Sequence, residues 1–175
     1  MFHAPPELVN GLSVRQKRIY DFLNGMHCGV ICSISPDILP HASVVYHVVN
    51  ETDFSVSFLT KTGTRKYDDL IHDNHVVFIV FDEESQTVAQ VTGNAYEITG
   101  PNDVNGIAAR VYTNSLSSKK NGVLPIARLQ AGTYTAFTIV PDQIRITSYG
   151  QPRSGDYEHM FDSIESFDLH PDRSS

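Results

Sequence analysis

One segment of the sequence gathers residue types that suit anion binding. It is Thr60-Lys-Thr-Gly-Thr-Arg-Lys66, with three hydroxyls, one glycine and three cations. The segment follows the alternating apolar run Phe54–Leu59 and precedes Tyr67–Ile71. The alternating apolar residues predict a strand, the glycine predicts a turn, and the residues after it predict a helix. The last two cations would therefore lie in the first turn of that helix.

Arg65 and Lys66 are unfavourable at this place for a helix alone, because the helix dipole already makes its N-terminus partly positive. A bound anion would reverse the penalty. Free backbone N–H groups, the hydroxyl of Thr64 and the two cations together would form a phosphate seat. The alternative is an ordinary polar turn whose cations pair with Asp68 and Asp69.

The histidines and serines lack the spacings of common catalytic sites. His41 and His47 stand six residues apart on one expected strand, and therefore on one face. No metal spacing such as His-Glu-x-x-His occurs. We interpret the histidines as solvated or core residues. The sequence also lacks Gly-x-Ser-x-Gly and Gly-x-Gly-x-x-Gly, which argues against a serine hydrolase and a Rossmann dinucleotide site.

Cys28 and Cys32 stand four residues apart on an expected strand. At about 3.3 Å per residue they are roughly 13 Å apart, which is too far for a disulfide. Their spacing is typical of neither a zinc site nor a redox site. We interpret both as reduced core residues.

Polar residues interrupt an otherwise apolar strand at Gln86, Thr87 and Gln90. A buried amide needs hydrogen-bond partners, and the edge of a heterocyclic ring is one candidate partner for Gln90. A strand that faces water on one side explains the same pattern. The residues alone leave both interpretations open.

The 175-residue chain has a formal net charge of −7 and a pI near 5.5. This charge argues against a general binder of nucleic acid or anionic membranes. No stretch approaches the roughly 18 apolar residues of a membrane span, and the N-terminus lacks a signal-peptide core. We expect a soluble cytoplasmic protein with one domain over 1–175, including an N-terminal arm at 1–12 and a C-terminal tail at 150–175.

Periodicity predicts a mainly β chain with peripheral helices. Strands are expected at 29–34, 41–49, 54–60, 75–82, 87–99, 134–140 and 144–149. Helices are expected at 13–25, where Ser13-Val-Arg-Gln16 is a capping box, and at 65–73, 101–114 and 123–129, with a last one carrying Met160, Phe161, Ile164 and Phe167. The apolar strand 75–82 is expected to be buried on both faces, and Gly93 predicts a bulge or close backbone approach. The pattern favours an antiparallel β-barrel, with a β-sandwich as the alternative.

Four features follow one another along the chain. They are Pro40-His-Ala-Ser-Val-Val-Tyr46 before an acidic turn, Phe58-Leu-Thr60 with Thr64-Arg65-Lys66, the run from Leu70 to Phe81, and Val88-Ala-Gln-Val-Thr-Gly93. The last three features are similar, in the same order, to three motifs of one protein family. These motifs are Phe-Tyr-Thr followed by Ser-Arg-Lys, then Leu-x-x-Asn-Pro-x-Val, and then Val-x-Val-x-Gly. In this order the set resembles the pyridoxamine 5′-phosphate oxidase-like family of FMN-binding split barrels, over roughly residues 15–100.

The resemblance implies an α+β, mainly β split barrel that forms a homodimer with FMN at each subunit boundary. It implies that Arg65 and Lys66 grip the phosphate with the hydroxyl of Thr64. The other implied contacts are Thr60 near the ribityl phosphate, the backbone of Ser43–Val45 along the isoalloxazine ring, and Gln90 at the ring's polar edge. The implied cofactor-binding set is Ser43, Val44, Val45, Thr60, Lys61, Thr64, Arg65, Lys66 and Gln90.

The sequence departs from the oxidases that name this family. Val44 and Val49 stand on a strand where those enzymes carry basic residues, and Thr87-Val88 replaces their Arg-Gln pair. Their C-terminal substrate-binding Arg and His have no counterpart in Asp168–Ser175. Oxidation of pyridoxamine phosphate is therefore not expected.

We expect instead an FMN-binding flavoprotein, without a metal ion, that transfers hydride or electrons to a small organic substrate. The alternative is a carrier or sensor that holds deazaflavin or haem without turnover. A third hypothesis is a cofactor-free β-barrel interaction module. Tyr46, Tyr96 and His47 are candidate proton donors, and no catalytic residue is assigned.

Overall fold

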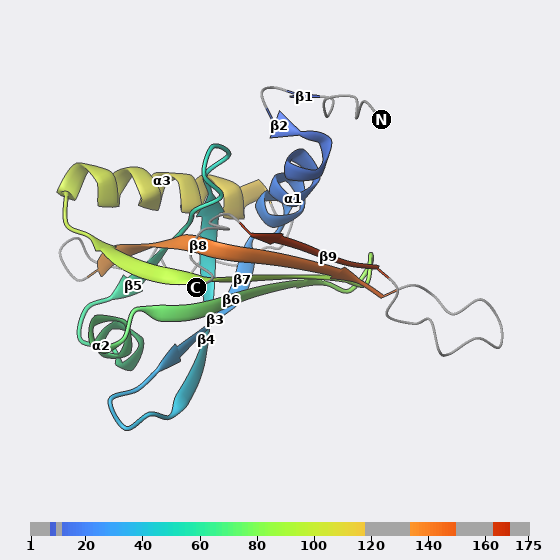
Figure 1. The fold of residues 1–175 in the computed structure, drawn as a ribbon. Helices are drawn as coiled ribbons and strands as arrows, with labels where there is room; N and C mark the ends of the chain where they lie inside the picture. The colour runs from blue at the N-terminus through green and yellow to red at the C-terminus, as the bar shows by residue number, and fades with distance from the viewer. Residues whose placement is uncertain (1–7, 10–11, 118–133, 150–162, 169–175) are drawn as a thin grey trace.

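A computed structural model describes residues 8–9, 12–117, 134–149 and 163–168. Six of its strands are β3 (Cys28–Ile34), β4 (Pro40–Val49), β5 (Val56–Lys61), β6 (His75–Asp82), β7 (Thr87–Ile98) and β8 (Tyr134–Ser148). They pair antiparallel in the order β5-β4-β3-β6-β7-β8, and β8 also pairs with β5. This last pairing closes a barrel (Figure 1). The predicted antiparallel barrel is thereby confirmed.

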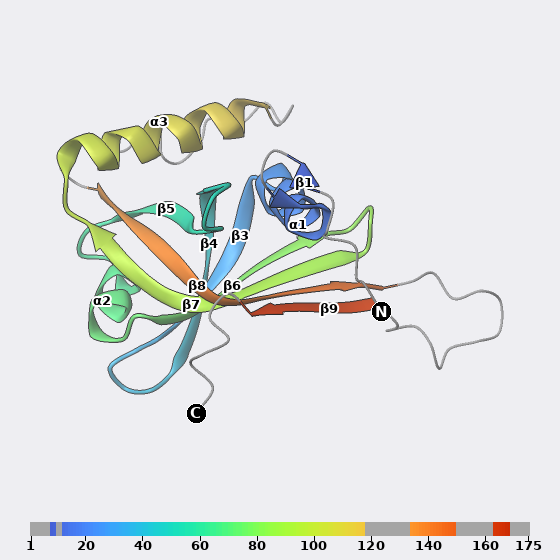
Figure 2. The same ribbon diagram turned by 45° about the horizontal axis from the view of Figure 1, so that its top comes forward.

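In the described part of the chain, three helices lie outside the barrel: α1 (Val14–Gly25), α2 (Arg65–His72) and α3 (Pro101–Ser117). Figure 2 shows α1 and α3 above the barrel and α2 beside its lower left. Before α1, β1 (Leu8–Val9) and β2 (Leu12–Ser13) form a small hairpin. The capping box predicted for α1 is present, because Ser13 and Gln16 bond each other's backbone N–H. Within the described ranges, no helix combines the length and hydrophobicity needed to span a bilayer.

The core is built mainly from the inward-facing residues of the strands, with Phe54 added from the turn before β5. Its largest side chains include Phe54, Phe58, Phe78 and Phe137, all nearly inaccessible to solvent. Phe58 of β5 and Phe137 of β8 are register partners, and their rings stack with centroids 6.0 Å apart. This aromatic pair lies at the seam where the barrel closes. Ile19 and Leu23 of α1 and Leu70 of α2 add to the same core.

The two strands predicted at 134–140 and 144–149 are one continuous strand, β8. Pro141 does not end it, because Pro141 lies opposite Gly93 at an irregularity in the β7–β8 register. The register skips Asp142, whose carboxylate accepts a hydrogen bond of 3.1 Å from Asn94 Nδ2. A Cβ atom at Gly93 would lie 2.2 Å from the carbonyl oxygen of Val140. The bulge and close approach predicted at Gly93 are confirmed, and they carry the strand through the proline.

The helix predicted to carry Met160, Phe161, Ile164 and Phe167 is wrong over residues 163–168, the part that the structure describes. Residues Ser163–Asp168 form a strand, β9, which pairs with Gln143–Ser148 of β8. That half of β8 extends past its pairing with β5, and its free edge needs backbone partners. The helix predicted at 123–129 lies outside the described residues.

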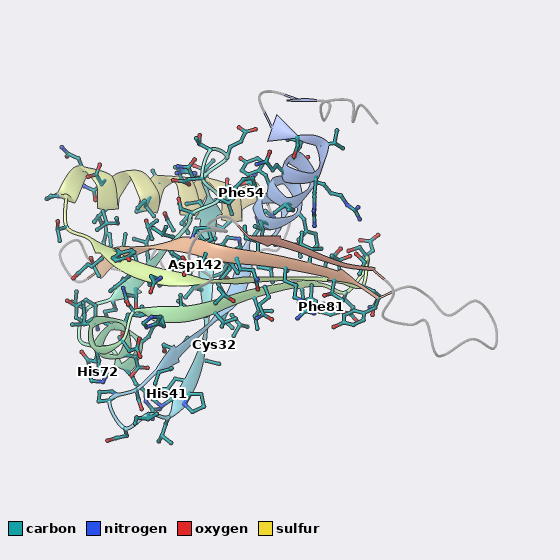
Figure 3. All side chains as sticks on the ribbon, viewed as in Figure 1. Cys32, His41, Phe54, His72, Phe81 and Asp142 are labelled. Atoms are coloured by element: carbon teal, nitrogen blue, oxygen red, sulfur yellow. The ribbon has the colours of Figure 1, made fainter. Side chains whose placement is uncertain are left out.

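Two predictions of burial are corrected. β6 is buried on one face only, because Val77 and Ile79 are half-buried and the Phe81 side chain is 51% exposed. Cys28 is exposed and Cys32 is half-buried, although both are free thiols as predicted. The outward faces of β3 and β6 are thus less covered than their apolar composition suggests. Figure 3 shows the positions of Cys32 and Phe81.

Candidate functional site

A cleft of about 430 Å³ lies between β4, β5 and the beginning of α2. Its lining residues are Ser43, Val44, Val45, Tyr46, Leu59, Thr60, Lys61, Thr64, Arg65 and Lys66. All the cofactor-binding residues inferred from the sequence line this cleft except Gln90. A cleft of this volume falls in the usual range of small-molecule sites.

The cleft exists because β4 and β5 separate. They pair only at His47–Val49 with Val56–Phe58, and the rest of β5 pairs with β8 alone. The preceding part of β4, Ser43–Tyr46, bonds β3 on one side and has no strand partner on the other among the described residues. An open strand edge presents unpaired backbone N–H and C=O groups. These groups form one wall of the cleft, which we call the β4 wall (Ser43–Tyr46).

The opposite wall is the turn from β5 into α2. Gly63 adopts φ +68°, a left-handed conformation that glycine takes without steric cost. Thr64 is the N-cap of α2 as predicted, accepting a hydrogen bond from Tyr67 N. Its own hydroxyl donates to the carbonyl of Lys61 at 2.8 Å. In this conformation the hydroxyl proton braces the turn, and the free donors are backbone N–H groups of the first helical turn.

Arg65 and Lys66 complete this corner, and we call Thr64, Arg65 and Lys66 the anion seat. Among the described residues no carboxylate pairs with either cation. The alternative of ion pairs with Asp68 and Asp69 is therefore wrong. Arg65 is exposed, whereas Lys66 is half-buried, and burial lowers the pKa of its ammonium group below the ordinary value. A buried charge without a partner is costly, and an anion in the cleft would relieve that cost.

Of the remaining sequence candidates, the structure brings only Tyr46 to the cleft. Gln90 is exposed on β7, opposite Ile79 and Arg145. Tyr96, also on β7, is exposed and lines no part of it. Of the three candidate proton donors, only Tyr46 lines the cleft. The predicted cofactor-binding set omits two lining residues, Leu59 and Tyr46, of which Tyr46 is predicted only as a candidate proton donor.

His47 is a buried structural residue and not a proton donor at the cleft. Its Nε2 donates a hydrogen bond of 3.0 Å to the carbonyl of Leu23, and its ring meets Phe78 edge-on. Its Nδ1 has no hydrogen-bond partner among the described residues. Burial lowers the pKa of His47 from 6.5 to about 4. The imidazole is therefore neutral at neutral pH and ties β4 to α1.

The protonation of His47 should make the fold sensitive to acid. Its pKa is lower folded than unfolded, so the stability is complete above pH 6.5 and is lost as the pH falls through about 4. We expect a loss on the order of 3 kcal/mol over this range from this group. Urea unfolding from pH 7 to pH 4 measures it. His47→Gln keeps an N–H donor for Leu23 and should flatten this part of the curve, and a variant curve parallel to the wild type would contradict the assignment.

No protein-family model matches the sequence, and no curated protein sequence matches it. Solved structures do share the fold. General stress protein 26 from Bacillus anthracis is 17% identical with a TM-score of 0.61, covering 89% of this chain and 98% of that chain. A Clostridium acetobutylicum protein of the pyridoxinephosphate oxidase family, related to general stress protein 26, is 11% identical with a TM-score of 0.61. The match covers 88% of this chain and 94% of that chain.

A heme binding protein from Mycobacterium smegmatis is also similar. It is 11% identical with a TM-score of 0.64, and the match covers 87% of this chain and 57% of that chain. These three solved structures share the fold of this chain at low sequence identity. The chain therefore has the split-barrel fold of the pyridoxamine 5′-phosphate oxidase-like proteins.

Proposed function

We propose that this chain binds FMN in the cleft between β4, β5 and α2 and acts as a flavin-dependent oxidoreductase on a small organic substrate. The phosphate would sit on the anion seat, beside Thr60 and Lys61. The isoalloxazine ring would lie along the β4 wall. When bound, FMN would supply the hydride or electron transfer, and the protein would bind and orient it.

The observation that carries the proposal is the unpartnered cation pair at the start of α2. Lys66 is half-buried with a lowered pKa, and neither it nor Arg65 has a carboxylate partner among the described residues. Arg suits bidentate contact with phosphate oxygens, and Lys supplies a point charge. The first-turn amides of α2 point toward the same corner. These donors fit a phosphate better than they fit a neutral ligand.

The β4 wall suits a flat polar ring. Unpaired backbone groups on an open strand edge offer hydrogen bonds to ring nitrogen and oxygen atoms. Val44 and Val45 provide apolar contacts, and Tyr46 brings a hydroxyl that can hold a proton near the ring. Tyr46 is accordingly the residue that we propose as a proton donor.

The β3–β4 hairpin, which includes the β4 wall, carries exposed apolar residues. Ile38 and Leu39 at its tip are 81% and 55% exposed, and Val44 is 67% exposed. Exposed apolar groups that gather in one region are typical of interaction surfaces. We propose that a second copy of the chain covers them, so that the cofactor lies at a subunit boundary.

The experiment is a titration of the purified chain with FMN and with riboflavin, which lacks the phosphate. We expect a yellow protein that quenches flavin fluorescence and binds FMN at least about a hundredfold more tightly than riboflavin, because each charge-assisted contact contributes about 1.5–3 kcal/mol. Sedimentation velocity on the same sample should give twice the 19.5 kDa mass of one chain. Equal affinity for the two flavins would contradict the anion seat.

The same sample discriminates the other candidates. One protein of similar fold is a heme binding protein, and a Soret band after haem addition without flavin binding would favour haem. Tighter binding of a phosphorylated deazaflavin than of FMN would favour that cofactor, because the anion seat serves both. Oxidation of NADH or NADPH by the loaded protein separates an enzyme from a carrier.

A further inference from the structure

Helix α2, which carries the anion seat, is fixed to the barrel by very few residues. It has eight residues, and its buried side chains are Asp69 and Leu70. The half-buried Tyr67 also packs edge-on against Phe137, and its hydroxyl donates a hydrogen bond of 3.4 Å to Glu97 on β7. A helix this short is not stable alone, so its position depends on those contacts. Leu70 joins the apolar core. Asp69 is different, because a carboxylate that is 2% exposed must be hydrogen-bonded to be tolerated.

The partners of Asp69 come from two neighbouring strands. Ser33 Oγ on β3 and His41 Nδ1 on β4 donate to the same oxygen, Asp69 Oδ2, at 3.0 Å and 2.8 Å. Ser33 and His41 are direct register partners in the β3–β4 pair. One carboxylate oxygen therefore bridges both strands of the hairpin that extends beside α2. Figure 3 shows His41 on this hairpin. We call Ser33, His41 and Asp69 the clamp.

The clamp links the two walls of the cleft. Asp69 follows Lys66 by three residues on α2, within one turn of the anion seat. His41 precedes Ser43, the first residue of the β4 wall, by two residues on one strand. Neither Asp69 nor His41 lines the cleft. The clamp thus joins α2, one turn from the anion seat, to the strand that forms the β4 wall.

We propose that Asp69 is a positioning residue that sets the anion seat at the distance from the β4 wall that a phosphate-bearing ring ligand needs. This inference rests on the proposed function. Apolar packing at Leu70 and Tyr67 holds α2 near the barrel but is not directional, and the hydrogen bond from Tyr67 to Glu97 is long at 3.4 Å. Two hydrogen bonds to one oxygen restrict both the rotation of the helix and its slide along the hairpin. A small misplacement of binding groups is enough to cost much affinity.

The test compares Asp69→Ala with Asp68→Ala. Both substitutions remove one carboxylate from α2, but Asp68 is exposed and lies outside the clamp. Dissociation constants for FMN and riboflavin are measured by fluorescence quenching. We expect Asp69→Ala to bind FMN about tenfold more weakly with riboflavin affinity unchanged. Asp68→Ala should bind FMN at least as tightly as the wild type, because it removes a negative charge that would repel the negative phosphate of FMN.

Ser33→Ala and His41→Ala keep the proposal testable if Asp69→Ala does not fold, because each removes a single hydrogen bond. Both should lower FMN affinity and spare riboflavin. An unchanged preference for FMN in the clamp variants would overturn the inference and leave the proposed function intact. An equal loss of both flavins would mean that the clamp only stabilises the fold, which also overturns it. A wild type without preference for FMN would overturn the proposed function and this inference with it.

Discussion

Replacement of both Arg65 and Lys66 by alanine should weaken FMN binding by about two to four orders of magnitude. Each cation is expected to contribute a charge-assisted contact of about 1.5–3 kcal/mol, and about 1.4 kcal/mol is a factor of ten. The cofactor-free protein should be at least as stable as the wild type. Lys66 is half-buried with a lowered pKa, so removal of its charge relieves a desolvation cost. Flavin fluorescence and urea unfolding measure the two effects.

The matched control is Lys17→Ala with Arg145→Ala. This control also removes one lysine and one arginine charge. Lys17, however, bonds Asp21 on α1, and Arg145 is exposed on β8. Neither residue lines the cleft. The control should retain FMN affinity within about twofold at physiological ionic strength, because charges that lie away from the cleft are screened by salt. If the two double variants lose equal FMN affinity, the loss comes from the change in net charge. The phosphate then does not bind at the anion seat.

Phe58→Ala should lower the free energy of unfolding by about 3–5 kcal/mol. Phe58 is fully buried, and it stacks on Phe137 across the β5–β8 seam. Truncation would remove apolar contacts and leave a cavity where the barrel closes. Its neighbours Leu59 and Thr60 line the cleft, so this seam also supports one wall of the site. Denaturant unfolding followed by circular dichroism measures the loss.

Phe81→Ala is the control for this prediction, because the same atoms are removed from a side chain that is 51% exposed on β6. Its cost should be about 1 kcal/mol or less. Phe58→Leu should fall between the two variants, since it refills much of the cavity. Similar losses for Phe58→Ala and Phe81→Ala would mean that the β5–β8 seam is not the packed centre that the structure shows.

The sequence alone predicted features that depend on neighbours along the chain. The capping box at Ser13, the turn at Gly63 and the N-cap at Thr64 all formed as expected. Each follows from hydrogen bonds and backbone angles within about four residues, so local residue types decide it. The apolar runs likewise predicted the barrel strands to within a few residues, apart from β8, which was predicted as two strands.

Where neighbours in space decide the outcome, the sequence was a poorer guide. Pro141 predicts a turn, yet β8 continues through it. Gly93 on β7 lacks a side chain and so leaves room for the backbone of Val140 and Pro141. Ser163–Asp168 pairs as a strand because the far half of β8 offers a free edge. The cleft opens because β5 pairs with both β4 and β8 as far as Phe58 and with β8 alone after it. Asp69 bonds Ser33 and His41 and does not pair with Arg65. Such contacts join residues dozens of positions apart, so only the closed barrel determines which of the available partners each group meets.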